Sequence, residues 1–455
     1  MKEQKKSYIK RILAIAIPMM LSSLISELQM VIDRAFIGQL SLDSMSAVGN
    51  ASTPIWTTMN IIFSFATGAT ILASQAYGAG DHERAKGILA SLFKFSNIPA
   101  ALLCLFWLFC SRFTFNLMGV DESIIDMSIS YAQIYAPIFI LTGIGAAVSA
   151  MLQVCQKTKI MILYGITRSL TNVLLDYLLI FGRFGFPAMG VKGAALATAM
   201  AEFLGDLIVL VYVLKSDELI LRPTFSQIWH AKVRPYLNTI RLGAPAACEE
   251  FAWNLGNLYL LVMLNQISKE AAGIHSIIFS VELVAVALLV AIGSATLTLS
   301  GYETGRKNIR GVWDVVMNSS LLALGISIVN LIVFIAFPRQ LLGIFTTDES
   351  VLAAAPIYLL IVGVDLFPKA GNIIFGSGIK GYGEPSWMLK TQTFGTLFIA
   401  GMSSLMVLVF HMGIMEIFML VVADEVIRFI FNSIKLRRTT KAKGGNEHGN
   451  TRQQN

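Results

Sequence analysis

Long apolar stretches separated by short polar gaps run through most of this sequence. A bilayer core about 30 Å thick is crossed by a helix of about 20 apolar residues. Stretches of that length recur from near the N-terminus to residue 434, so the pattern predicts an all-α membrane protein with about twelve transmembrane helices. The expected spans are 12–38, 52–77, 88–111, 128–152, 160–181, 190–214, 240–266, 272–300, 313–337, 351–377, 386–410 and 413–434.

A longer polar interval near the middle of the chain divides the spans into two groups. The expected parts are an N-terminal six-helix lobe (1–214), a cytoplasmic linker (215–239), a C-terminal six-helix lobe (240–437) and a disordered cytoplasmic tail (438–455). Within the linker, apolar residues recur at helical spacing, which is typical of an amphipathic helix on the membrane surface. An ordinary solvated linker explains the same pattern. The residues concerned are Trp229, Val233, Tyr236 and Leu237.

The two groups of spans are related by an internal repeat. The segment 68–80, GATILASQAYGAG, aligns with 293–305, GSATLTLSGYETG, at a constant offset of 225 residues. Two further landmarks repeat at an offset of 227 residues, so the similarity extends over separated Gly, Pro and Tyr positions. Because six is an even number of spans, both copies begin on the same side of the membrane. This predicts parallel repeats related by an axis along the membrane normal. The further landmarks are Pro18 with Pro245 and Tyr131 with Tyr358.

The basic residues predict the orientation of the chain. Lys and Arg in short loops mark the cytoplasmic side of a membrane protein. With the N-terminus inside, most of them fall in the N-terminal segment, the middle linker, the other inside loops and the C-terminal tail. Both termini are therefore expected in the cytoplasm. The basic start at 2–11 precedes an apolar run without a small-residue cleavage site, so it is interpreted as a retained first helix. The loops on the opposite side hold Arg112, Arg183, Lys192, Lys269 and Arg339.

The composition excludes several classes of function. Of 455 residues, 55% are hydrophobic and only 14% are charged, whereas soluble domains average about 25% charged residues. A soluble enzyme and a disordered chain are excluded on that ground. The net charge of +7 is spread over many short gaps, so a nucleic-acid partner is not expected. The chain has neither GxxxxGK nor HExxH, and its GxGxxG match at 376–381 follows no predicted strand, so no enzyme activity and no cofactor are expected.

Acidic residues inside the spans are the main chemical signal. A charged side chain at the bilayer centre costs about 2.5–3.5 kcal/mol on insertion scales. Few bases accompany these acids, and an excess of buried carboxylates favours a path for Na⁺ or protons. Asp33, Asp176 and Asp365 lie deep in their runs, whereas Glu202 and Asp206 are expected nearer span ends, where they reach water. The acids are Glu27, Asp33, Asp176, Glu202, Asp206, Glu249, Glu250, Glu282 and Asp365, and the bases are Arg34, Arg168 and Lys369.

Several motifs resemble one family of transporters. They are VIDRAFIGQL at 31–40, AVGN at 47–50, SQAYGAGD at 74–81, and the pair NVLLDYLLIFG at 172–182 and MGVKGAALAT at 189–198. Over nearly its whole length the chain resembles the multidrug and toxic compound extrusion (MATE) family of the MOP flippase superfamily. The last two motifs are the most specific ones.

The resemblance implies ion sites in both halves. In the family, an Asp of the first helix and an Asn-x-x-x-Asp of the fifth form a cation or proton site, which Asp33, Asn172 and Asp176 match. Gln29 and Thr198 are expected neighbours, and Na⁺ is the one metal ion expected there. A second acidic site, from the seventh and tenth helices, is matched as follows: Glu249 and Asp365, with Glu250 as a further neighbour.

Two departures from the family pattern affect the first site. Arg34 follows Asp33 where many members have a small or hydroxyl residue, and an ion pair there would keep Asp33 ionised. Gln29 stands where some members have Tyr. These positions leave the choice between Na⁺ and H⁺ open.

The resemblance implies a secondary antiporter that exports cationic or amphipathic drugs in exchange for Na⁺ or H⁺ by alternating access. Such a protein is expected to be a monomer in the plasma membrane, in contact with lipid and a drug-like small molecule. The alternative is a lipid-linked oligosaccharide or lipid flippase of the same superfamily, which the few buried bases disfavour. An uncoupled channel or receptor would leave the intramembrane carboxylates unexplained.

The orientation can be tested with a reporter fused after Asn455. The excess of basic residues on one side predicts that the reporter is active only in the cytoplasm. Activity confined to the extracellular side would contradict both the layout of spans and the parallel repeat.

Overall fold

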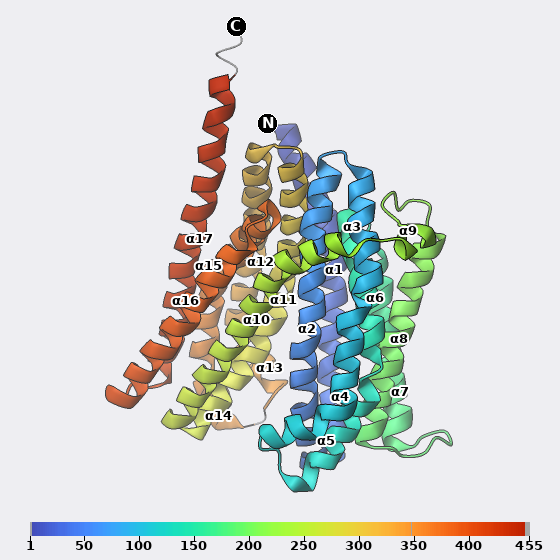
Figure 1. Ribbon diagram of the computed structural model, residues 1–455. Coiled ribbons are helices and arrows are strands. Elements are labelled where there is room, and N and C mark those ends of the chain that lie inside the picture. Colours follow the sequence, from blue (N-terminus) through green and yellow to red (C-terminus); the bar gives the residue numbers. More distant parts are fainter. Residues whose placement is uncertain (1, 347, 451–455) are drawn as a thin grey trace. The chain divides into compact units, whose positions relative to one another are not determined.

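The computed structural model describes residues 2–346 and 348–450, with side chains described between residues 7 and 440. In this part of the chain the secondary structure is helical and contains no strand, which confirms the all-α prediction. Each predicted span is covered by a long helix or by two consecutive helices (Figure 1). Eight of the helical segments are long and apolar enough to cross a membrane on their own, and one bent pair adds a ninth.

The helices extend beyond the predicted spans at many ends, because they continue past the apolar run into polar sequence. The first half contains α1 (Lys2–Gly38), α2 (Leu42–Gly78), α3 (His82–Phe95), α4 (Asn97–Leu117), α5 (Glu122–Tyr135), α6 (Ile138–Val154), α7 (Ile160–Phe181), α8 (Val191–Lys215) and α9 (Phe225–Trp229). The second half contains α10 (Val233–Ile267), α11 (Lys269–Gly305), α12 (Ile309–Ala336), α13 (Pro338–Gly343), α14 (Glu349–Ala354), α15 (Pro356–Tyr382), α16 (Pro385–Ser404), the π-helix η1 (Leu405–Val409) and α17 (Ile414–Asn450).

Two spans are broken near their middle or first third. Ser96 separates α3 from α4, and its hydroxyl donates a hydrogen bond to the Gly143 carbonyl of α6 at 2.9 Å. Pro137 separates α5 from α6, which meet at a bend of 49°. Proline lacks an amide hydrogen and disfavours a helical preceding residue, so the bend lies where the sequence removes a helical hydrogen bond.

The chain forms two compact units whose limits differ from the predicted lobes. The N-terminal unit comprises Ile17–Ala73 and Asp81–Ala244, and the C-terminal unit comprises residues up to Ala16, Ser74–Gly80 and residues from Pro245 onward. The start of α1 and the end of α2 therefore belong to the C-terminal unit.

Packing within the C-terminal unit explains this division. The Arg11 guanidinium lies 4.7 Å from the centre of the Tyr302 ring, and Gln75 donates a hydrogen bond to the Gly381 carbonyl at 3.0 Å. The first turns of α1 and the last turns of α17 lie at the same end of this unit (Figure 1). That arrangement agrees with an even number of crossings, while the side of the membrane remains a prediction.

The linker does not contain the continuous amphipathic helix that its spacing suggested. Trp229 ends the short helix α9, residues 230–232 are not helical, and Val233 begins α10. A capping box between Thr224 and Gln227 begins α9. The apolar residues of the pattern are therefore divided between two helices, and one of them, Tyr236, is buried with its ring 5.9 Å from that of Phe95.

Contacts of the linker with neighbouring loops and helices hold it within the N-terminal unit. The Lys94 ammonium donates to the Trp229 carbonyl at 2.5 Å, beside the end of α3. On the other side, Lys157 pairs with Glu218 at 2.6 Å, and this partner holds the pKa of the Glu218 carboxyl below its ordinary value.

The tail was expected to be disordered from residue 438, but α17 continues through it to Asn450. Leu436 is buried and the Thr440 hydroxyl bonds to its carbonyl at 2.9 Å, so the helix is still anchored beyond the last span. Residues 451–455 of the predicted tail lie outside the described residues.

Close packing of α7 on α8 gives a test of this fold. A Cβ atom added at Gly193 would lie 2.7 Å from the carbonyl carbon and oxygen of Leu179, so the helices meet where α8 has no side chain. We expect Gly193→Val to destabilise the protein by about 1–3 kcal/mol, as overpacking of a filled core does. Gly87→Ala is the matched control, because nothing lies within 4 Å of its added Cβ. Thermal unfolding in detergent measures both variants, and an unchanged midpoint for Gly193→Val would contradict the packing.

Candidate functional site

The residues predicted for the first ion site converge in the N-terminal unit. Gln29 and Asp33 come from α1, Asn172 and Asp176 from α7, and Thr198 from α8. Gln29 Nε2 donates to Asn172 Oδ1 at 2.7 Å and reaches Asp33 Oδ2 at 3.4 Å. Asn172 Nδ2 reaches the Thr198 hydroxyl at 3.4 Å. The four-residue spacings 29/33 and 172/176 place each pair on one helix face, so two helices present two carboxylates and two amides to the same point.

The two carboxyl groups of this site face each other. Asp33 and Asp176 lie within hydrogen-bonding reach of one another. Asp176 is 1% exposed, and its Oδ1 has no hydrogen-bond partner in the described part of the chain. Two ionised carboxylates at this separation repel each other, so the pair requires a shared proton or a bound cation between its oxygens.

The amide of Asn172 lies against the Asp33 carboxyl group. In one orientation its oxygen accepts from Gln29 and faces the two Asp33 oxygens at 2.6 and 3.2 Å. Turned over, its nitrogen donates to the same two oxygens, which suits a carboxylate better. In either orientation Asn172 lies between Gln29 and Asp33 within the site.

Sequence reasoning missed two members of this site. Ser169, one turn before Asn172 on the same face of α7, donates to Gln29 Oε1 at 3.1 Å. Tyr131 of α5 is buried and lies near Thr198 and both carboxylates. The sequence singled out Tyr131 only as a landmark of the repeat. Its place within a predicted span was the one signal that the sequence offered.

No base pairs with either carboxyl group of this site among the residues whose side chains are described. Arg34 is exposed, and within the described residues it forms no ion pair with Asp33. Arg168, the other nearby base, pairs instead with Glu202 of α8 at 2.5 Å, and the Tyr164 hydroxyl donates to the same carboxylate at 2.9 Å. Glu202 was expected near water but is buried at 6% exposure, because this ion pair compensates its charge.

The acids predicted for the second site do not come together in the C-terminal unit. Glu249 of α10 pairs with Lys380 at 2.9 Å, while Asp365 pairs with Lys369 at 2.9 Å. Both lysines belong to α15, three turns of helix apart. Glu250, the expected neighbour, is exposed. Each predicted acid therefore has its own base.

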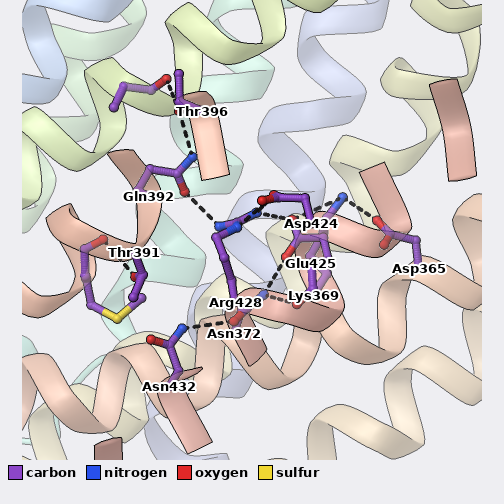
Figure 2. Close-up of polar contacts among 12 residues, drawn as sticks. Asp365, Lys369, Asn372, Thr391, Gln392, Thr396, Asp424, Glu425, Arg428 and Asn432 are labelled. Atoms are coloured by element: carbon purple, nitrogen blue, oxygen red, sulfur yellow. Dashed lines mark hydrogen bonds and ion pairs between the residues drawn. The ribbon is translucent and has the colours of Figure 1, made fainter. Parts of the chain in front are cut away.

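Asp365 belongs instead to a buried network of charges (Figure 2). Lys369 contacts Asp365, Glu282 of α11 and Glu425 of α17. Arg428 pairs with Asp424 and with Glu425, both at 2.8 Å. Amide side chains complete the network: Gln392 accepts from Arg428 at 2.8 Å, Asn372 donates to Glu425 at 2.6 Å, and Asn432 donates to Asn372 at 2.9 Å.

Half of the charged residues of this network, and all three of its amides, were absent from the predicted residues. Asp424, Glu425 and Arg428 were overlooked although they interrupt an apolar run, at a spacing of three and four that places them on one face of α17. The charges of the network are partly balanced, because two bases face four acids. The C-terminal unit thus contains its own counter-cations, whereas the Asp33–Asp176 pair has none in the described residues.

The network predicts unequal roles for the two lysines of α15. Removing Lys369 leaves buried carboxylates without their cation, which costs about 3–5 kcal/mol. We expect Lys369→Met to lower the thermal midpoint strongly or to prevent folding. Lys380→Met, which removes a single pair nearer the surface at 21% and 17% exposure, is the control and should have a smaller effect. Equal midpoints for the two variants, measured in the same detergent, would contradict the central role of Lys369.

Comparison with known proteins agrees with this architecture. A "Probable multidrug resistance protein NorM" of Thermotoga maritima is 29% identical over 436 residues, covering 94% of this chain and 92% of that protein. An "Uncharacterized transporter YisQ" of Bacillus subtilis is 24% identical over 88% of this chain and 87% of its own length. Among solved structures, a MOP superfamily transporter from Pyrococcus furiosus has a TM-score of 0.89 at 18% identity, covering 96% of this chain and 97% of that chain.

The family comparison also reproduces the internal repeat. The MatE family model matches twice, over residues 18–178 and 245–403. The two matches begin at Pro18 and Pro245, the same pair of prolines that marks the offset of 227 residues. Together they cover more than half of the chain. This multi-pass membrane protein therefore belongs to the MatE family of transporters.

Proposed function

We propose that this protein is a secondary antiporter that exports cationic or amphipathic drugs by alternating access, and that a single Na⁺ or H⁺ bound between Asp33 and Asp176 drives export. The observation that carries the proposal is a pair of facing carboxyl groups, buried at Asp176 and partly buried at Asp33, with which no base pairs among the described residues. Such a pair is most stable when it holds one cation. The family relatives named as multidrug resistance proteins support the choice of substrate.

The chemistry of the site suits either coupling ion. Carboxylate, amide and hydroxyl oxygens are the ligands that hard cations prefer, and Asp33, Asn172 and Thr198 supply one of each. A proton shared by Asp33 and Asp176 satisfies the same pair. The driving force depends on the charge of the drug. Import of one Na⁺ or H⁺ against export of an uncharged drug moves one charge, which provides about 2.3 kcal/mol per 100 mV, or roughly a fortyfold concentration gradient. Export of a monovalent cation for one Na⁺ or H⁺ moves no net charge and is driven by the concentration gradient of the ion alone.

The flippase alternative has less support. Recognition of an anionic lipid-linked substrate favours unpaired Arg and Lys. The buried bases of both units are instead paired with carboxylates, as in Arg168–Glu202, Lys369–Asp365 and Arg428–Asp424.

Asp176→Asn tests the coupling role directly. The substitution keeps the shape of the side chain but removes its charge, so we expect normal membrane insertion and near-complete loss of gradient-driven efflux. Ethidium or norfloxacin transport in vesicles, with Na⁺ and pH gradients imposed separately, measures the loss and identifies the coupling ion. Asp126→Asn is the control, since Asp126 forms an exposed pair with Arg112 and should pump normally.

The same assay separates the two units. Asp365→Asn should impair transport only if the C-terminal network takes part, alone or jointly with the first site. Inserted Asp176→Asn protein that pumps against a gradient at the wild-type rate would remove Asp176 from the mechanism.

A further inference from the structure

A basic cluster lies at one end of the seam between α16 and α17 in the C-terminal unit. It consists of Lys390 of α16 and of Lys435 and Arg438 of α17. The two helices are in contact at this level, since the Trp387 indole donates a hydrogen bond to Asn432 Oδ1 at 2.9 Å. The Lys435 ammonium lies 5.3 Å from the centre of the Trp387 ring. The cluster therefore lies where α16 begins, while α17 continues beyond it to residue 450 (Figure 1).

Helical spacing places the cluster in line with aromatic side chains. On each helix a row of residues follows at intervals of three and four, which puts its members on one face. The rings of Phe394 and Phe431 lie 5.7 Å apart, so the two rows border the same seam. The rows are Trp387, Lys390 and Phe394 on α16, and Phe431, Lys435 and Arg438 on α17.

Next to the cluster the seam is apolar and exposed. Phe394 and Phe431 are 43% and 41% exposed, and Leu397, one turn further along α16, is 68% exposed. These side chains face lipid, because α16 belongs to a segment that is long and apolar enough to cross a membrane. Lys390 and Leu397 are about 10 Å apart along the helix at 1.5 Å per residue. The apolar seam thus follows part of the length of one acyl chain.

The cluster contains more positive charge than the surrounding chain balances. Lys435 pairs with Glu384. Lys390 and Arg438 are exposed, and among the described side chains neither forms an ion pair. Lys390 also lies within the predicted span 386–410, where a charge is costly unless it reaches water or an anion at the membrane surface.

We propose that this seam binds one anionic diacyl phospholipid of the surrounding leaflet, with its phosphate held by Lys390 and Arg438 and an acyl chain on the apolar seam. Basic pockets between transmembrane helices bind anionic lipid headgroups. Trp387 suits the boundary between headgroup and acyl chains, which tryptophan favours, and its bond to Asn432 fixes the indole there. A soluble phosphate would contact the bases alone, so the continuous apolar surface favours a lipid.

General attraction between the basic end of a membrane protein and anionic lipid is the competing explanation. It predicts that any two exposed bases at this end of the unit contribute equally. Lys10 and Arg310 allow the comparison, because they are one Lys and one Arg, like Lys390 and Arg438. Both are exposed, and they belong to α1 and α12 instead of the seam.

Native mass spectrometry of the purified full-length protein in detergent tests the proposal. The protein is titrated with palmitoyl-oleoyl phosphatidylglycerol or with phosphatidylcholine of the same acyl chains. The wild type should bind one phosphatidylglycerol about tenfold or more tightly than phosphatidylcholine, because only the first has a net negative charge. Lys390→Gln combined with Arg438→Gln should weaken phosphatidylglycerol binding by about thirtyfold, as expected for the loss of two bases near an anionic headgroup.

Two further variants test charge and place separately. Lys390→Arg combined with Arg438→Lys exchanges the two bases and keeps their charge, so it should bind phosphatidylglycerol with nearly wild-type affinity. Lys10→Gln combined with Arg310→Gln is the matched control and should change the affinity little. Equal losses in this control and in Lys390→Gln with Arg438→Gln would overturn the seam as a site and leave general attraction.

The remaining outcomes decide the nature of the ligand. Displacement of phosphatidylglycerol by an equal concentration of sn-glycerol 3-phosphate would overturn the assignment to a lipid. Wild-type affinity in Lys390→Gln with Arg438→Gln protein that has an unchanged thermal midpoint would overturn the site itself. The single variants Lys390→Gln and Arg438→Gln should each lose part of the affinity, which keeps the test decisive if the double variant does not fold. None of these measurements depends on transport, so the site stands or fails independently of the proposed antiport.

Discussion

The energetic cost of placing carboxylates inside an apolar helical protein governs both halves of this molecule. A buried charge requires a partner, and removing that partner costs more than the pair contributes. Asp33 and Asp176 face each other with amides and hydroxyls around them but with no base among the described residues. That pair can complete its charge balance only with a cation from solution, which makes it a candidate for coupling to an ion gradient.

The C-terminal unit meets the same cost in the opposite way. Lys369 and Arg428 lie within a cluster of acids and bring fixed counter-charges from the chain itself (Figure 2). Every acid of this network contacts one of the two bases, although two bases face four acids, whereas neither carboxyl group of the Asp33–Asp176 pair contacts a base among the described residues. The two repeats share a fold and a family model, yet their buried charges are balanced by different means. This asymmetry is the reason for assigning coupling to the N-terminal unit.

Much of the fold could be predicted from the sequence. The lengths of the apolar runs gave the spans, and the constant offset between similar segments gave the repeat. The Asn172/Asp176 spacing and the match of Asp33 to the family motif also pointed to residues that lie together in the structure, while their role as an ion site stays a prediction. The sequence did not show which charged side chains pair with each other in the folded protein. The sequence placed Glu249 with Asp365, whereas each has its own lysine on α15. It also overlooked Glu425 and Arg428, although these charges interrupt an apolar run, and local spacing does not show that Glu425 meets Lys369 of another helix.

The surroundings of Asp206 illustrate the same limit. The sequence placed Asp206 near a span end, whereas it lies well inside α8. The contact of its carboxyl group with Gly145 of α6 and the pairing of Arg168 with Glu202 depend on how α6, α7 and α8 pack. Linker contacts were unpredictable for the same reason, because Tyr236 is buried against Phe95 from a different helix.

Direct counting of bound ions tests the central claim. Purified protein can be titrated with radioactive Na⁺ at fixed pH, and its proton uptake can be followed with a pH indicator in the absence of Na⁺. The account predicts that one of these ions binds saturably to the wild type and to Asp365→Asn, and that Asp33→Asn and Asp176→Asn each abolish that binding. Retention of the bound ion in Asp176→Asn, together with its loss in Asp365→Asn, would contradict the account.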